Sequence, residues 1–369
     1  MLGLYINIPF YNYISNEFSN ELLLNPSEDE INNYIDHLIK EIKGYSIFFP
    51  RIKTIYIGGG VPSILNSNQL LKLLKYLEIL SPVEFTFEVD VSNITLEKAQ
   101  ILSNHGVNRI SLKINTFNNQ LLKTLNKPYE KKDIIKAIKI FKEVKIKNIN
   151  IDLTFGIPNQ TLIDIKNDLK EVKKHLFSHV SFYELDIQED SYFDKKDMCL
   201  EHDLKMNMFK NIINDLKNIR YKHYEITHFT YKEQYSLHNT LYWTLEEYIG
   251  TGLGAHSFIN NKRLINNSNL ISYYENPIAE IIPQTKKDNI ENYLIFGLRQ
   301  LRGINIVDFK NKYKVDILEQ YPKLNDYIKD GILQLKDNNL SLTKEGIFYS
   351  NLVFEVFIWN ISLKIMSTI

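Results

Sequence analysis

The stretch "LYINIPFYNYISNEF", residues 4–18, begins with a short apolar run and continues as a polar loop. Similar β-rich runs recur up to about residue 190, and amphipathic helical patterns separate them. Strands that alternate with helices form right-handed βαβ units around a parallel sheet. The sequence therefore predicts an α/β fold, either a partial (β/α)6 barrel or a doubly wound sheet, and we favour the partial barrel. The predicted strands are Leu4–Ile8, Thr54–Ile57, Glu84–Glu88, Arg109–Ile114, Ile149–Leu153 and His179–Tyr183.

The pattern changes after about residue 200, where a helix near 201–218 precedes a probable strand, "KHYEITHF", at 222–229 and a Gly-rich turn, "IGTGLGAHSF", at 249–258. Helices are then predicted at 288–301, 306–312 and 322–330, before a hairpin whose Asn-Asn turn joins "LQL" to "LSL". Helices followed by a small hairpin indicate a winged-helix-like module. We divide the chain into the partial barrel at 1–200, a barrel extension at 201–285 and the winged-helix-like domain at 286–369.

Composition restricts the classes of function. The 44 basic and 44 acidic residues give no net charge, which argues against a nucleic-acid partner. The single cysteine, Cys199, forms no intramolecular disulfide and no thiolate cluster. No basic leader and no transmembrane segment is predicted, so we expect a cytoplasmic protein. The apolar segment 351–369 is interrupted by Glu355 and Lys364; we expect a packed terminal helix or strand, with peripheral membrane contact as the less favoured alternative.

Polar or glycine-rich motifs follow several predicted strands. "YIGGGVPS", residues 56–63, contains Gly58, Gly59 and Gly60, which either expose bare backbone to a ligand or form a tight structural turn. Its spacing matches neither nucleotide-binding glycine motif. Glu88, Asn115 and Asp152 stand at or near later strand ends, and each alone is explained as a cap. Because parallel strands of a barrel end at one mouth, together they indicate a ligand site there.

In order along the chain, these motifs resemble one family. "LYINIPF", "IYIGGGVPS", "GVNRIS", "IDLTFGIPNQT", "YEITHF", "HNTLYW" and "YIGTGLGAHSF" are similar to motifs of the radical S-adenosylmethionine (SAM) branch that contains oxygen-independent coproporphyrinogen III oxidases and their haem-chaperone relatives. The resemblance covers nearly the whole chain, including the winged-helix-like end. It implies a radical-SAM-type partial barrel.

The loop at 8–18 departs from that family. There, "IPF" is followed by three cysteines, spaced C-x-x-x-C-x-x-C, which ligate a [4Fe–4S] cluster. Tyr11, Ser15 and Phe18 occupy these positions here. Phenylalanine cannot ligate iron, serine is a poor ligand, and tyrosinate is a hard ligand mismatched to the cluster. The resemblance therefore implies a dismantled site without a conventional cluster, and hence without radical generation from SAM.

The implied SAM pocket is partly eroded. The resemblance places Gly58, Gly59 and Gly60 at the methionine end of SAM, and Glu88 and Asp152 at positions that contact it. Asn115 stands where glutamine is usual, and Lys127 replaces a usual arginine, which loses the bidentate fork. Val61 replaces a hydroxyl residue and Asn7 a common histidine. We expect at most weak binding of SAM or another small ligand.

One motif is intact. "HNTLYW", residues 238–243, matches the HN-x-x-YW signature of the haem-chaperone branch. The resemblance implies His238 as axial ligand of haem iron, Asn239 as the residue that orients its imidazole, and Tyr242 and Trp243 as flat faces for the porphyrin. The alternative is a buried His–Asn pair that caps a turn, with two aromatic side chains in the core. His228 and His256 are alternative iron ligands.

We therefore predict a haem-binding chaperone that transfers haem to a recipient protein without a functional cluster. One rival is an oxygen-independent coproporphyrinogen III oxidase, which would require the three cysteines. The other is a non-catalytic interaction protein that retains the fold and binds neither haem nor SAM. The sequence specifies neither the recipient nor the oligomeric state.

Overall fold

The computed structural model describes residues 1–19 and 23–357, which form two compact units. The first unit contains Met1–His223, Thr227–Leu241 and Glu246–Pro283. The second contains Tyr224–Ile226, Tyr242–Leu245 and the chain from Gln284 onward. The predicted three-part division stays a prediction.

A twelve-stranded sheet organises the described part of the first unit. Six of its strands lie side by side in chain order and are parallel, which confirms the partial (β/α)6 barrel. These strands are β1 (Leu2–Ile8), β4 (Ile52–Gly59), β5 (Glu84–Asp90), β6 (Arg109–Asn115), β7 (Asn148–Phe155) and β8 (His179–Glu184). Every strand predicted before residue 190 is present, with its ends shifted by at most two residues.

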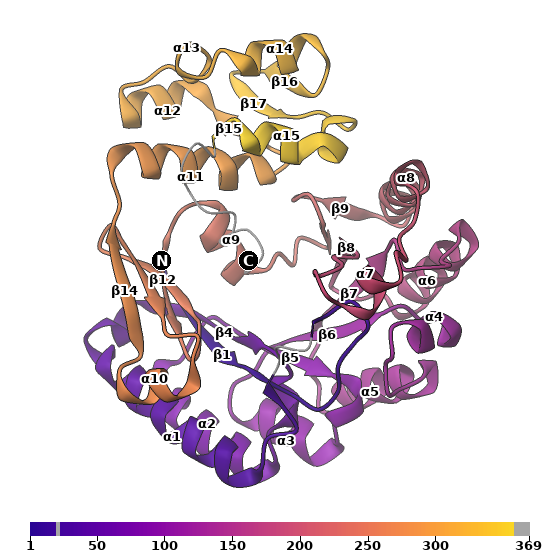
Figure 1. The fold of residues 1–369 in the computed structure, drawn as a ribbon, viewed down its shortest axis with the longest axis vertical. Coiled ribbons are helices and arrows are strands. Elements are labelled where there is room, and N and C mark those ends of the chain that lie inside the picture. Colours follow the sequence, from indigo (N-terminus) through magenta and orange to yellow (C-terminus); the bar gives the residue numbers. More distant parts are fainter. Residues whose placement is uncertain (20–22, 358–369) are drawn as a thin grey trace. The chain divides into compact units, whose positions relative to one another are not determined.

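Helices connect these strands. Figure 1 shows α1, α2, α3 and α5 along the outer side of the curved sheet. A capping box begins each of α1, α2 and α6. In each box, the side chain of the cap residue accepts a hydrogen bond from the backbone N–H of residue N3, and the side chain of N3 accepts one from the backbone N–H of the cap residue. The helices between the parallel strands are α1 (Glu28–Gly44), α2 (Ser67–Leu77), α3 (Leu96–Asn104), α4 (Asn119–Thr124), α5 (Lys131–Glu143) and α6 (Leu162–His175).

The strands alternate between an apolar outer face and a polar inner face. On β6, Ile110 and Leu112 are fully buried on the helical side. The intervening Ser111 and Lys113 contact side chains of the neighbouring strands inside the barrel. The same alternation gives Asn150 and Asp152 of β7 to the inner face. The barrel interior is therefore lined by hydrogen-bonding and charged groups.

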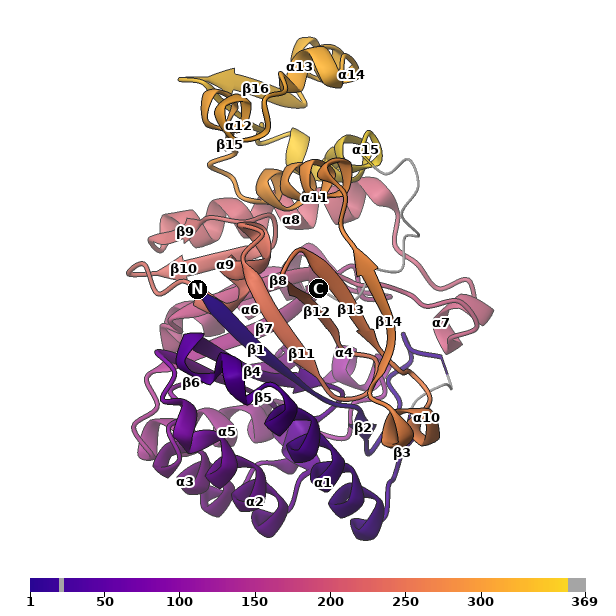
Figure 2. The same ribbon diagram turned by 90° about the vertical axis from the view of Figure 1, so that its left-hand side faces the viewer.

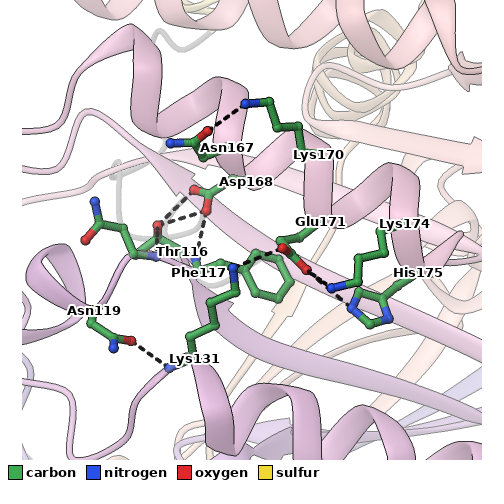
Figure 3. A network of polar contacts seen from close by, with 11 residues as sticks. Thr116, Phe117, Asn119, Lys131, Asn167, Asp168, Lys170, Glu171, Lys174 and His175 are labelled. Carbon is green, nitrogen blue, oxygen red and sulfur yellow. Dashed lines mark hydrogen bonds and ion pairs between the residues drawn. The ribbon is translucent and has the colours of Figure 1, made fainter.

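A buried carboxyl connects α6 to the end of β6. Asp168 accepts hydrogen bonds from the Thr116 hydroxyl at 2.8 Å and the Phe117 backbone N–H at 2.7 Å (Figure 3). One turn later on α6, Glu171 pairs with Lys131 of α5 at 2.9 Å. These contacts fix the carboxyl end of β6, which carries Asn115.

The sheet continues beyond both sides of the parallel core. On one side, after α7 (Tyr192–Lys195) and α8 (His202–Asn218), β10 (His228–Tyr231) runs antiparallel to β8 and pairs with β9 (Tyr221–His223). On the other side, β11 (Glu247–Thr251) is parallel to β1. Figure 2 shows it beside β1, followed by the antiparallel β12 (His256–Ile259), β13 (Lys262–Asn266) and β14 (Ile278–Pro283). The Gly-rich stretch 249–258 contains the β11–β12 connection, and α10 (Leu270–Glu275) precedes β14.

The single strand predicted at 222–229 is wrong, because its centre is interrupted. Between β9 and β10, Tyr224–Ile226 belong to the second unit. There the Ile226 N–H donates to the Arg299 carbonyl at 3.2 Å, and the Leu301 N–H donates to the Tyr224 carbonyl at 3.1 Å. A bridge with residues distant in sequence therefore replaces the expected continuous strand.

The second unit has the predicted helices and hairpin, which confirms the winged-helix-like C-terminal module. Asp337 and Asn338 form the hairpin turn with φ of 51° and 61°, as a type I′ turn requires. The predicted Asn-Asn turn is wrong by one residue, because Asn339 pairs with Lys336 and begins β17. The terminal segment predicted at 351–369 begins within α15, and residues 358–369 lie outside the described residues. The elements are α11 (Lys286–Arg299), β15 (Ile304–Asn305), α12 (Ile306–Tyr313), α13 (Ile317–Gln320), α14 (Lys323–Lys329), β16 (Leu333–Lys336), β17 (Asn339–Leu342) and α15 (Ser350–Glu355). Across residues 1–19 and 23–357, each helix is too short or too polar to span a membrane.

Candidate functional site

The loop after β1 is fastened to the segment 124–127. Ser15, 2% exposed, donates its hydroxyl hydrogen to the Leu125 carbonyl at 2.7 Å. The Asn16 N–H donates to the same carbonyl at 3.1 Å, and the Asn126 amide donates to the Ile14 carbonyl at 2.8 Å. The loop therefore has a defined conformation that is held by its own polar groups.

An ion pair and aromatic rings fill the space around this loop. Lys127 Nζ lies 3.5 Å from Glu17 Oε1, and both side chains are at most 7% exposed. The same ammonium lies 5.5 Å from the centre of the Tyr13 ring, whose hydroxyl donates to Asp90. Lys127, predicted for the SAM pocket, thus pairs with the loop that follows β1.

Tyr11, Ser15 and Phe18 are the three residues predicted to stand at the cluster positions, and that assignment stays a prediction. None carries a thiol, and the Ser15 hydroxyl is already engaged by Leu125. Tyr11 belongs to β2 (Phe10–Tyr11), which pairs with β3 (Leu23–Leu24), while the Phe18 N–H donates to the Ser15 carbonyl. Cys199 is exposed and lies between α7 and α8. In the described chain, no group of three His, Cys, Asp or Glu residues is arranged to hold a metal ion.

The three glycines at the end of β4 lie against the chain's own groups. Gly59 has φ of +107°, and a Cβ there would stand 1.7 Å from the Asn7 Oδ1. A Cβ on Gly60 would stand 2.6 Å from the Phe10 carbonyl oxygen and 2.9 Å from Cε2 of Tyr11. Close packing alone therefore requires glycine at these two positions, which is the structural alternative that the sequence left open.

Glu88 is paired inside the barrel. Its Oε1 accepts from the Tyr56 hydroxyl at 2.7 Å, and its Oε2 lies 2.7 Å from the Lys113 Nζ. Lys113 also lies 3.4 Å from the Gly59 carbonyl oxygen. Burial by itself lowers the pKa of Lys113, but the Glu88 carboxylate outweighs it, so the pKa is raised and the ammonium is charged.

Sequence reasoning missed Lys113 as a site residue. The available signal was alternation, because Lys113 stands two residues after Ser111 and two before Asn115 on the same strand face. A charged residue at an inward position of a barrel strand requires a partner. Which partner it takes depends on the register between strands, and the sequence does not specify that.

Asp152 and Asn115 stand close to Lys113 along the strand ends. Lys113 and Asp152 are register partners on β6 and β7. Asp152 accepts from the Ser111 hydroxyl and the Asn150 amide, both at 2.8 Å. Asn115 has φ of 59° and donates to the Thr154 hydroxyl at 2.9 Å. The glycine run, Glu88, Asn115 and Asp152 thus share one end of the parallel strands, which we call the mouth.

His238 lies toward the opposite end of the strands. It belongs to α9 (Leu237–Trp243), is 1% exposed, and has its Nδ1 2.8 Å from the Thr54 hydroxyl oxygen. The backbone N–H groups of Leu237 and His238 each donate to the Glu84 carboxylate at 2.9 Å. Thr54 and Glu84 lie near the amino ends of β4 and β5. Burial, assisted by the Arg109 charge, lowers the pKa of His238 to about 3, so the imidazole is neutral near pH 7.

The other residues of the HN-x-x-YW signature are divided between the units. Asn239, half-buried, belongs with His238 to the first unit, and its N–H donates to the Ser236 hydroxyl at 3.4 Å. Tyr242 and Trp243 belong to the second unit. Trp243 is buried there, with its carbonyl accepting from Gln300 at 3.1 Å, while Tyr242 is half-buried. The predicted haem roles of these residues stay predictions.

The alternative histidines occupy different strands. His228, on β10, is 5% exposed, and one ring nitrogen lies 3.2 Å from the Tyr183 hydroxyl. His256 begins β12, and burial lowers its pKa. In the strand order, β10 and β12 lie on opposite sides of the parallel core. The three candidate histidines therefore represent three distinct positions for a haem ligand.

Two family models, several curated relatives and a solved structure are similar to the chain. Residues 20–172 match the model of the radical SAM superfamily, and residues 284–349 match that of the HemN C-terminal domain. The chain is 31% identical to the heme chaperone HemW of Lactococcus lactis over 96% of both chains. It is 29% identical to that of Bacillus subtilis, over 97% of this chain and 99% of the relative. The solved structure of Escherichia coli coproporphyrinogen III oxidase (HemN), described as a radical SAM enzyme, matches the fold with a TM-score of 0.84 at 20% identity, over 96% of this chain and 89% of that chain.

Proposed function

We propose, from the premise that this chain belongs to the heme chaperone HemW family, that it binds haem and transfers it to a recipient protein. The observation that carries the proposal is the 31% identity to a heme chaperone over 96% of both chains. The matched 96% of the chain spans the HN-x-x-YW signature of this sequence as well as both matched domains. The single cysteine suits a reducing compartment, and we place the transfer in the cytoplasm.

The transfer needs no radical chemistry. A radical SAM reaction draws its electron from a cluster held by three thiolates, and Tyr11, Ser15 and Phe18 provide none. This argues against the rival function of a coproporphyrinogen III oxidase. SAM is the weaker candidate ligand: Glu88 and Asp152 retain the carboxylates that the family places beside it, but the Lys113 ammonium already lies against Glu88.

His238 is our first candidate for the iron ligand. Its imidazole is neutral near pH 7, and the neutral form is the one that coordinates iron. Thr54 and the Glu84 carboxylate hold its ring and its backbone in place, as residues around a metal ligand do. Because His238 is 1% exposed, coordination requires the first turn of α9 to move. Such a gated ligand suits a carrier, which has to release its cargo.

A haem titration tests the proposal. Purified wild-type chain is titrated with haem while the Soret band is followed, alongside His238→Ala, His228→Ala and His105→Ala. His105 lies at the end of α3 outside the barrel and serves as the matched control. We expect the Soret change to saturate at about one haem per chain, and to be altered in His238→Ala alone among the three variants.

The other outcomes are distinct. Altered binding in His228→Ala with unchanged binding in His238→Ala would retain the haem function and move the ligand to β10. A wild-type chain that shows no saturable Soret change would contradict haem binding. That result would favour the interaction protein that retains the fold.

A further inference from the structure

The mouth of the first unit is filled by side chains of the chain itself. The Tyr11 ring packs against Gly60, where a Cβ would meet its Cε2 at 2.9 Å. The Lys113 ammonium lies 2.7 Å from the Glu88 carboxylate and 3.4 Å from the Gly59 carbonyl oxygen. Two elements far apart in sequence thus supply an aromatic ring and a cation to one place.

The groups around the Lys113 ammonium form a cation site. An ammonium offers three N–H donors, and both named partners are acceptors. Glu88 is 8% exposed, and its other oxygen is occupied by the Tyr56 hydroxyl. Asp152, the register partner of Lys113, adds a second negative charge that also raises the lysine pKa. Without a cation beside them, the carboxylates of the buried Glu88 and the half-buried Asp152 would destabilise the fold, because buried charge needs an opposite charge.

We propose that Lys113 is an internal ligand of this cation site and closes it to small molecules that carry an ammonium group. The inference is independent of haem binding, because it concerns the mouth at the carboxyl ends of the strands. The Lys113 side chain is 42% exposed, so solvent reaches the mouth at this residue. Removing the lysine therefore opens a path to Glu88 without requiring the barrel to unfold.

The ligand class follows from the acceptors. A primary ammonium reproduces the donors of Lys113, whereas a quaternary ammonium carries the same charge and no N–H group. The amino-acid end of SAM belongs to the first class. We therefore expect the wild-type chain to exclude the very group that the retained carboxylates would otherwise attract.

Chemical rescue tests the proposal on the full chain. Thermal unfolding of Lys113→Ala is followed with increasing n-propylammonium chloride and, separately, tetramethylammonium chloride. We expect propylammonium to raise the melting temperature of the variant with the logarithmic dependence on concentration that binding to one site gives, on the order of 2 °C at ten times its Kd. We expect tetramethylammonium to give only the effect of ionic strength, and wild type to respond to neither salt beyond that effect.

The matched control is Lys131→Ala. Lys131 is 43% exposed and lies 2.9 Å from Glu171, an ion pair on the outer helices with similar distance and exposure (Figure 3). The melting temperature of Lys131→Ala should not rise with propylammonium beyond the effect of ionic strength. Equal responses in the two variants, or none in a folded Lys113→Ala chain, would overturn the proposal.

A second measurement covers failure of that variant to fold. Glu88→Gln retains an acceptor for Tyr56 but removes the charge that holds the ammonium. Acetylation of individual lysines by an N-hydroxysuccinimide ester, followed by mass spectrometry, should then increase at Lys113 relative to Lys131, because loss of the Glu88 charge lowers the lysine pKa and leaves more free amine. An unchanged ratio would contradict an ammonium held by Glu88.

Discussion

At the scale of single residues, Asp168 gives the fold a specific dependence on pH. Its side chain is 1% exposed, and burial raises its pKa to about 7 although Phe117 and Thr116 donate hydrogen bonds to it. The folded state therefore binds this proton more tightly than the unfolded state, where the pKa is near 3.8. Stability from this group is fully present below pH ~4 and is lost as the pH rises to ~7.

The test is Asp168→Asn, which removes the titration. Denaturant unfolding of the first unit is measured at pH ~4 and at pH ~8. Between these two pH values, the free energy of unfolding should fall by up to about 4 kcal/mol less in the variant than in wild type. Asp36→Asn, at an exposed surface pair with Lys72, is the control and should leave the wild-type slope unchanged. A slope in Asp168→Asn equal to that of wild type would mean that Asp168 does not titrate in this range.

Residue-level prediction from sequence worked where it depended on periodicity and failed where it depended on pairing across strands. Alternation and strand ends located Glu88, Asn115 and Asp152 near one mouth. Lys113 escaped notice because its role is set by the register of β5 against β6. Glu17 was not predicted as a paired residue, because its partner Lys127 is 110 residues away.

At the scale of elements, the loop after β1 is stabilised by the buried ion pair between Lys127 and Glu17. Lys127→Met leaves the Glu17 carboxylate at 5% exposure without its cation. We expect a loss of about 3 kcal/mol in the free energy of unfolding, as for other broken buried pairs. Adding Glu17→Gln should recover most of this loss, because the remaining charge is then removed.

Urea denaturation of the two single variants and the double variant measures this coupling as a double-mutant cycle. Lys72→Met breaks the exposed Lys72–Asp36 pair and should cost below about 1 kcal/mol. A double variant no more stable than Lys127→Met would show that the lysine acts through packing on Tyr13 alone.

Element prediction failed where distant segments intervene. The predicted strand at 222–229 has the composition of one strand, yet Glu225 bridges Gln300 and pairs with Arg299 at 2.7 Å. The hairpin at 333–342 was predictable because its turn is local, and Asp337 and Asn338 adopt the positive φ that a two-residue turn demands. Local turn chemistry is readable in a sequence, whereas contacts across 75 residues are not.

At the scale of the whole molecule, the chain retains the fold of its relatives but has no cysteine at residues 11, 15 and 18. The fold matches that of the solved HemN structure with a TM-score of 0.84 over 96% of this chain. The positions that would hold a cluster carry Tyr11, Ser15 and Phe18, and Ser15 is bonded to the backbone of the segment 124–127. A fold of this kind is preserved by its apolar outer strand faces, which do not depend on a metal.

Iron analysis after anaerobic reconstitution tests this separation of fold from cofactor. Full-length wild type is incubated with ferrous iron and sulfide, desalted, and analysed for bound iron and for cluster absorption. Because no thiolate is available at the three positions, we expect fewer than about one iron per chain and no cluster absorption.

The variant Tyr11→Cys/Ser15→Cys/Phe18→Cys controls for the reconstitution, since it regains three thiolates at the spacing of the family and removes the Tyr11 ring from its contact with Gly60. Wild type that binds about four irons per chain would contradict the argument, and would return the chain to the class of radical SAM enzymes.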